Sequence, residues 1–187
     1  MNRPEVILFP QSSYRRMRWK NGAGWTSEIA LEPGADGQFA WRISIAEIDA
    51  DSDFSLFPGI DRTLVVLSGG GMVLDVADGS NHELRPLGTP LVFPGELVIR
   101  ARLLAGATRD FNVMTRRTVF THQLAVLFSG TSKRITRTPS ARVFVYMLAG
   151  ALWGAEAGDS LLIPAGETWA FDLPEEVEVI VVELRQI

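Results

Sequence analysis

The apolar residues of this chain come in short runs that end at glycine or proline, and hardly any segment keeps a 3.6-residue period over three helical turns. Instead, large apolar residues alternate with polar or small ones at 41–46 and again at 111–114. Alternation with a period of two is typical of a strand with one packed face, whereas an amphipathic helix repeats its apolar residues every three or four positions. The sequence therefore predicts a nearly all-β protein.

A glycine and proline marker occurs twice. Gly88 is followed by five residues and then Pro94, and Gly158 is followed by five residues and then Pro164. Each proline ends a run rich in Leu, Ile, Val or Phe. Two β units of one kind in tandem favour a duplicated small barrel or jelly roll, a solution that protects strand edges by curling each sheet.

The composition excludes several classes of function. The chain has no cysteine, which rules out disulfides, thiolate zinc sites and cysteine nucleophiles. Its net charge of −4 argues against non-specific nucleic-acid binding, which needs a concentrated basic surface. No apolar run approaches the ~20 residues of a transmembrane helix, and the run at 6–9 is too short for a signal peptide. We expect a cytoplasmic protein that binds neither nucleic acid nor membranes.

The stretch 18–29 gathers a cation, an amide, two indoles and two glycines. Gly22 and Gly24 allow the backbone to approach a neighbour or a ligand closely, so we expect a structured loop rather than strand or helix interior. Lys20 and Asn21 can donate hydrogen bonds to an anionic or carbonyl group, and Trp19 can form a wall. The alternative is an exposed glycine turn that one tryptophan anchors to the core.

Further polar residues lie on strand-like segments elsewhere in the chain. Arg42 shares a strand face with Ser44, and it either faces solvent or is paired inside a wet pocket, because an unpartnered buried guanidinium costs several kcal/mol. Asp110 and Asn112 share another face, which is either solvated or part of a site. Arg62 follows Asp61 and could simply form a local ion pair with it.

Taken together, these segments supply positive charge, neutral hydrogen-bonding groups and aromatic walls, which describe a pocket for a small anion. The candidate ligand-binding residues are Trp19, Lys20, Asn21, Thr26, Arg42, Ser44, Phe57, Arg62 and Asn112. Glu28 and Asp110 are the possible acid or base groups of an enzyme, although we favour Glu28 as the partner of Lys20. His82 and His122 are interpreted as surface or core residues.

The spacing of Gly158, Pro164 and Gly166 resembles the second motif of the cupins, which are small β-barrels. A cupin metal site needs several histidines around one ion, and Trp169 stands where the histidine of this motif would fall. With only two histidines far apart in the chain, we expect no metal and no other cofactor.

A more specific pattern consists of the segments 19–24 (WKNGAG), Thr26, 28–29 (EI), 41–46 (WRISIA), 54–62 (FSLFPGIDR), Gly106 and 109–114 (RDFNVM). In these segments, the chain resembles the HutD/Ves family within the cupins. This resemblance implies a bicupin with an N-terminal barrel at 1–118 that holds the pocket and a shorter barrel at 119–187, with strands that could be shared. It also implies an association with bacterial histidine-utilisation genes and no firm enzymatic activity.

Three functions follow as hypotheses. The first is non-enzymatic binding of a small carboxylate metabolite, of which the family context suggests urocanate or N-formylglutamate, to regulate histidine utilisation. The second is a metal-independent cupin enzyme acting on a small organic acid. The third is a protein-interaction module of the same pathway, whose sign would be an apolar patch free of the loop cations.

Overall fold

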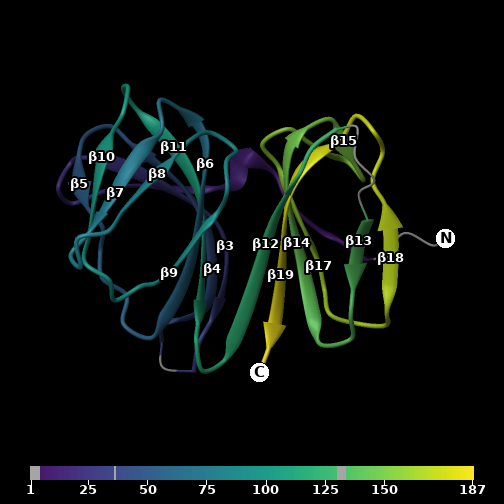
Figure 1. Cartoon of the computed structure of the whole chain (residues 1–187). Helices are drawn as coiled ribbons and strands as arrows, with labels where there is room; N and C mark the ends of the chain where they lie inside the picture. Colours follow the sequence, from purple (N-terminus) through teal and green to yellow (C-terminus); the bar gives the residue numbers. More distant parts are fainter. Residues whose placement is uncertain (1–4, 36, 130–133) are drawn as a thin grey trace. The chain divides into compact units, whose positions relative to one another are not determined.

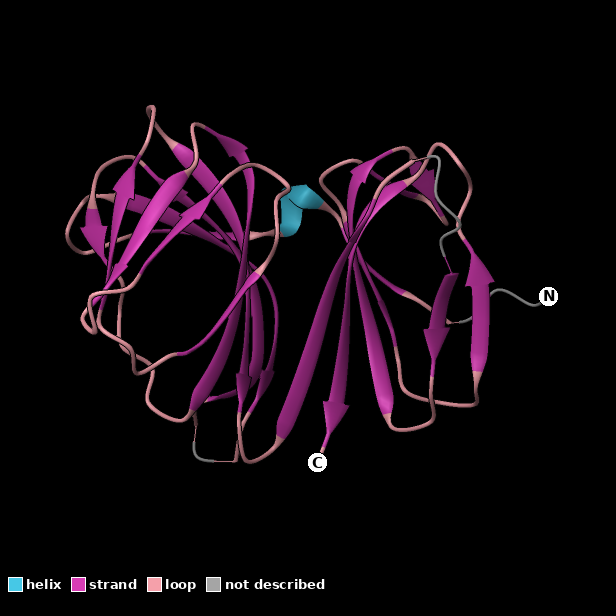
Figure 2. Ribbon diagram, in the orientation of Figure 1, coloured by secondary structure: helices cyan, strands magenta, loops and turns pink. Residues whose placement is uncertain are grey.

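The computed structural model describes residues 5–35, 37–129 and 134–187 and confirms the all-β class. Strands dominate, and the described residues contain a single short helical turn, η1 (Gln11–Ser13) (Figure 2). The chain divides into two compact units, Arg15–Val119 and Met1–Tyr14 with Phe120–Ile187. The first 14 residues thus group with the C-terminal part of the chain. The domain limits 1–118 and 119–187 stay a prediction.

The unit Arg15–Val119 consists of two antiparallel sheets (Figure 1). The six-stranded sheet has the order β2-β3-β4-β11-β6-β9, with β2 (Arg15–Arg18), β3 (Gly24–Pro33), β4 (Phe39–Ile48), β11 (Thr108–Arg116), β6 (Ile60–Gly69) and β9 (Leu91–Pro94). The four-stranded sheet has the order β5-β10-β7-β8, with β5 (Ser52–Asp53), β10 (Ile99–Leu103), β7 (Met72–Val76) and β8 (Asn81–Leu84).

One apolar core joins these two sheets. Ile48 and Leu64 come from the six-stranded sheet, Leu74 and Ile99 come from the four-stranded sheet, and all four are buried in the same cluster. Burial of such side chains contributes about 1.5–3 kcal/mol each and is the main force that holds two sheets face to face. The core fills part of the space between the sheets, and polar side chains continue along the same face of β4 and β11.

The apolar runs 63–67 and 72–76 flank Ser68 and three glycines, a pattern that predicts a hairpin, and this prediction is wrong. β6 pairs with β11 and β9, whereas β7 pairs with β10 and β8. The glycines between β6 and β7 instead turn the chain from one sheet into the other. A Cβ on Gly70 would lie 2.1 Å from the carbonyl oxygen of Ala105, so the chain can pass this corner only without a side chain.

Other local expectations also need correction. Only the middle of the stretch 18–29 is a turn, because β2 ends at Arg18 and β3 begins at Gly24. The segment 78–85 is rich in polar residues, which predicts a loop, but it contains β8. The segment 101–108 shows no regular alternation, which predicts irregular structure, but its first three residues belong to β10. In each case, pairing with a neighbouring strand supplies the order that the local sequence does not signal.

The second unit has a five-stranded sheet and two small ribbons. The sheet order is β1-β17-β14-β19-β12, with β1 (Ile7–Phe9), β17 (Ser160–Ile163), β14 (Ala141–Ala149), β19 (Glu178–Gln186) and β12 (Phe120–Leu127). The ribbons pair β13 (Arg134–Arg137) with β18 (Trp169–Asp172) and β15 (Ala151–Leu152) with β16 (Ala155–Glu156). The hydrogen-bonded sheets of the described residues do not close on themselves, so the arrangement as two barrels stays a prediction.

Candidate functional site

A cavity of about 500 Å³ lies inside the unit Arg15–Val119. Its walls come from β3, β4, β6 and β11, from the turn that follows β2, and from the segment that follows β5. The volume is within the range of small-molecule sites, about 300–1,000 Å³. The cavity is thus large enough for a small organic acid.

Strand register brings the polar side chains to this cavity. On β4 and β11, Ser44 pairs with Asn112, and Arg42 pairs with Met114, which in turn pairs with Arg62 on β6. Paired residues of neighbouring strands point to the same face of a sheet. Residues from three strands therefore meet on one face, although they are far apart in the sequence.

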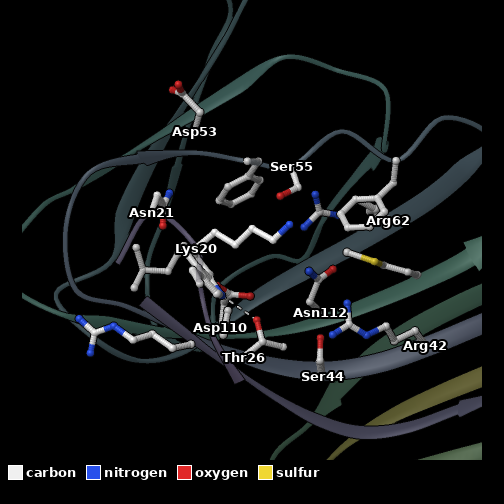
Figure 3. A pocket seen from close by; sticks show the side chains of 17 residues that line it. Lys20, Asn21, Thr26, Arg42, Ser44, Asp53, Ser55, Arg62, Asp110 and Asn112 are labelled. Atoms are coloured by element: carbon white, nitrogen blue, oxygen red, sulfur yellow. Dashed lines mark hydrogen bonds between the residues drawn. The ribbon is translucent and has the colours of Figure 1, made fainter. Parts of the chain in front are cut away.

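All nine candidate ligand-binding residues lie around this one cavity. They are Trp19, Lys20, Asn21, Thr26, Arg42, Ser44, Phe57, Arg62 and Asn112. Asp110 also lines it, whereas Glu28 does not. Figure 3 shows Lys20, Arg42, Arg62 and Asn112, which come from separate elements, around the same space, whereas the labelled Asp53 points away from it. A role of these residues in ligand binding stays a prediction.

The turn after β2 is held by its own hydrogen bonds. The indole Nε1 of Trp19 donates to Thr26 Oγ1 at 2.8 Å, and the Asn21 side chain accepts from the Ala23 backbone N–H at 3.1 Å. A Cβ on Gly24 would lie 2.2 Å from the Glu47 carbonyl oxygen, which explains the glycine there. These contacts place Trp19 and Asn21 at the cavity.

The side chain of Lys20 extends across the cavity (Figure 3). Within the described residues, no carboxylate forms an ion pair with its ammonium group. The expected partnership between Lys20 and Glu28 is wrong, because Glu28 Oε2 accepts a hydrogen bond from Arg42 Nε at 2.8 Å. Lys20 therefore brings to the cavity a positive charge that has no ion-pair partner within the described residues.

Arg42 faces the cavity rather than bulk solvent, which decides between the two orientations that the sequence left open. Its side chain is mostly buried, with 16% of its surface exposed, and the ion pair with Glu28 uses only Nε. A guanidinium carries five N–H donors in a planar fork. The remaining donors of Arg42 are thus available to a second acceptor.

Arg62 is buried, with only 5% of its surface exposed, and aromatic rings surround it. Its guanidinium carbon lies 4.9 Å from the ring centre of Phe93, 5.1 Å from Phe54 and 5.6 Å from Phe57. Burial lowers the pKa of Arg62 to about 10, although nearby Asp110 opposes this effect. The group thus remains a cation at neutral pH, and its Nε has no hydrogen-bond partner in the described part of the chain.

Asp110 is the most unusual side chain of the cavity. It is 1% exposed, and neither of its carboxylate oxygens has a hydrogen-bond partner among the described residues. Burial raises the pKa of Asp110 to about 7, while the charge of Arg62 acts in the opposite direction. The Oδ1 atom of Asn112 likewise lacks a partner within the described segments.

Sequence reasoning missed seven residues that line the cavity. They are Arg18, Ala46, Ile48, Asp53, Phe54, Ser55 and Met114. The alternation could have found Ala46, Ile48 and Met114, because they continue the faces of Ser44 and Asn112 at every second position. Arg18 begins the stretch 18–29, and Phe54 and Ser55 belong to the matching segment 54–62, so these three lie in segments that the sequence had marked. No local signal marks Asp53.

The described residues contain no group of three or more His, Cys, Asp and Glu side chains that could hold a metal ion. His82 lies in β8 and does not line the cavity, and His122 lies in β12 of the second unit. No helix in the described ranges has the length and hydropathy needed to cross a membrane.

Comparison with known proteins first gives the class. The fold is cupin-like, since a cupin 2 conserved barrel domain protein from Leptotrichia buccalis matches with a TM-score of 0.56 at 11% identity, covering 86% of this chain and 88% of the other. The family follows from a closer match. The HutD family model matches residues 11–181, and the chain therefore belongs to the HutD family.

Two solved structures support this assignment. HutD from Pseudomonas fluorescens SBW25, solved in a formate condition, is 30% identical, with a TM-score of 0.86 and coverage of 98% of this chain and 100% of the other. The conserved protein of unknown function PA5104 from Pseudomonas aeruginosa PAO1 is 32% identical, with a TM-score of 0.85 and the same coverage. The family supports the association with histidine utilisation that the resemblance implied.

Proposed function

We propose that this chain binds a small carboxylate metabolite in the cavity of the unit Arg15–Val119 and regulates histidine utilisation in the cytoplasm without altering the ligand chemically. The observation that carries this proposal is the charge around the cavity. Lys20, Arg42 and Arg62 all line it, and of these three cations only Arg42 forms an ion pair within the described residues. An organic anion would supply an ion-pair partner for the other two.

The burial of Arg62 and its packing between aromatic rings favour the binding of an anion in this cavity. Hydrogen bonds to charged groups contribute about 1.5–3 kcal/mol each, and planar guanidinium groups can hold a carboxylate with two bonds. Arg62 is already removed from water and its orientation is fixed by three phenylalanine rings. A carboxylate thus meets a cation that needs little desolvation or ordering, which favours binding.

The family context suggests urocanate or N-formylglutamate as the ligand. Both are small carboxylates of a size that a cavity of about 500 Å³ can enclose. The relative from P. fluorescens was solved in a formate condition, so formate is a suitable third probe for the carboxylate subsite alone.

Isothermal titration calorimetry with urocanate, N-formylglutamate and formate tests the proposal. Lys20→Met keeps the side-chain stem, removes the charge and should weaken binding about tenfold, the equivalent of about 1.4 kcal/mol. Arg102→Met is a matched control, since Arg102 is exposed, pairs with Asp75 and does not line the cavity. This control should leave affinity unchanged.

Two results would contradict the proposal. The first is the absence of binding at millimolar ligand, or equal affinities for Lys20→Met and the native protein. The second is chemical change of the ligand, which mass spectrometry of the same samples detects. Consumption of ligand would favour the metal-independent enzyme, with Asp110 rather than Glu28 as its base, because only Asp110 lines the cavity.

A further inference from the structure

We propose that Asp110 determines which acids the cavity accepts: its carboxylate accepts a hydrogen bond from an N–H group of the ligand. The ligand class is then narrower than small carboxylates, because it comprises acids that also carry an N–H donor, such as an imidazole or an amide. This inference rests on the proposed function, in which the cations of the same cavity hold the carboxylate.

The sheet itself offers Asp110 no partner. Its neighbours across the strands are Ala46 on β4 and Val66 on β6, and neither side chain can donate a hydrogen bond. Both carboxylate oxygens are buried and lack a partner in the described chain. Asn112, two positions further along the same face, adds a third oxygen in the same state. This face of the sheet therefore presents three buried oxygens that accept no hydrogen bond within the described residues.

Such an arrangement is costly in the free protein. A buried acceptor without a hydrogen bond costs about 1–3 kcal/mol, and more when it is charged. Native proteins keep few such groups, and those they keep call for a specific reason. A ligand N–H placed against Asp110 would satisfy the orphan oxygens and would thus contribute to binding rather than to folding.

Asp110 and the two arginines of the cavity start from different levels of the sheet, although the charge of Arg62 reaches Asp110. Asp110 is four residues from Met114, the residue that pairs with Arg42 on one side and Arg62 on the other. At about 3.3 Å per residue, the backbone of Asp110 and the backbone of Met114, with its paired arginines, are about 13 Å apart along the strand. Because arginine side chains reach several ångströms, the span left between them suits a molecule with a carboxylate at one end and an N–H group at the other.

The protonation state of Asp110 supports the same assignment. Its raised pKa of about 7 leaves the carboxyl half protonated near neutral pH, and an N–H donor would favour the ionised form. Binding should therefore release a proton. The charged groups that face the cavity with Asp110 are Arg62, Arg42, Lys20, Arg18 and Asp53, and Glu28 is held by Arg42.

The test compares two acids of the same shape. Urocanate carries an imidazole N–H, whereas 3-(2-furyl)acrylate keeps the carboxylate and the planar five-membered ring without that donor. At pH 8, calorimetry should show urocanate binding at least about tenfold more tightly to the native protein. Asp110→Leu should lower the affinity for urocanate to that for furylacrylate and should not weaken the binding of furylacrylate.

A second measurement needs no variant. Titrations of the native protein with urocanate at pH 7, in two buffers of different ionisation enthalpy, should report release of about half a proton per site, and furylacrylate should release none. The inference would be overturned if the native protein bound the two acids with equal affinity. It would also be overturned if Asp110→Leu lowered the affinity for both acids equally. Either result would leave the proposed function standing. If urocanate does not bind at all, this inference fails, and the proposed function fails with it only if N-formylglutamate and formate do not bind either.

Discussion

At the scale of single residues, the sequence indicated the side chains of the cavity but not their surroundings. A period of two places Arg42 and Ser44 on one strand face without telling which face lies inside. The choice depends on pairing with β11 and β3, which is a long-range property. The same holds for Asp110, whose burial without a partner is visible only when the neighbouring strands contribute Ala46 and Val66.

The ionisation of Asp110 gives a stability prediction. In the unfolded chain its carboxyl has the ordinary pKa of 3.8, and in the folded protein burial raises this pKa to about 7. Between about pH 4 and 7 the unfolded state has lost the proton that the folded state retains, so stability falls as pH rises and stays lower above pH 7. Asp110→Asn removes this dependence. In urea unfolding, the free energy of unfolding of the variant, relative to that of the native protein, should be about 1–3 kcal/mol higher at pH 8 than at pH 4.5.

A matched control for this experiment is Asp75→Asn. Asp75 is an acid of the same unit, but it is exposed, and hydrogen bonds from Arg102 lower its pKa. Its replacement should give no gain in stability at pH 8 relative to pH 4.5. If the free energies of unfolding of Asp110→Asn and the native protein differed by the same amount at both pH values, folding would not raise the pKa of Asp110.

At the scale of elements, glycines marked the places where the chain turns or the backbone approaches a neighbour, but they did not show which kind of turn forms. The segment 69–71 predicted a hairpin and instead forms a corner between two sheets, because both kinds of turn favour glycine and only the pairing partners differ. In the stretch 18–29, Gly24 indicated a close approach of the backbone correctly, and that approach occurs at the first residue of β3 rather than in a loop.

Gly24 provides a prediction at this scale. A Cβ at this position would lie 2.2 Å from the Glu47 carbonyl oxygen and 3.3 Å from the Trp19 ring. Gly24→Ala must therefore displace β4 backbone or the turn that carries Trp19, and overpacking of this kind costs about 1–3 kcal/mol. Thermal unfolding should show the loss of stability, and the fluorescence of the indoles should change with it.

The neighbouring glycine serves as the control. Gly22 has a φ of +74°, and a Cβ at this position would lie 3.8 Å from the flexible end of the Arg18 side chain, which is ordinary van der Waals contact. Asparagine adopts this left-handed conformation more readily than other residues with a side chain, so Gly22→Asn should cost less stability than Gly24→Ala. Equal losses in the two variants would contradict the packing explanation for Gly24.

At the scale of the whole molecule, the β class and the family could be predicted from the sequence, and the grouping of the chain could not. Periodicity and the repeated glycine and proline marker are local signals. The association of β1 with the C-terminal unit depends on its pairing with β17, some 150 positions away. Loop closure over such a distance leaves no pattern in the short segment itself.

The division into two units leads to the last prediction, which hydrogen exchange with mass spectrometry can check. A ligand at 100 times its dissociation constant stabilises the state that binds it by about 2.7 kcal/mol. This slows exchange about 100-fold for amides whose opening destroys the site. Because β3, β4, β6 and β11 carry the cavity, their amides should gain more protection with urocanate than those of β14 and β19.

The variant Lys20→Met provides the reference for this experiment, since at the same urocanate concentration its strands should gain less protection than those of the native protein. Arg102→Met should behave as the native protein does, because its side chain lies outside the cavity. Protection that is larger in β14 and β19 than in β4 and β11 would place the ligand in the other unit. In that case the cations around the cavity would need a different explanation, and the burial of Arg62 among three aromatic rings would be a structural feature alone.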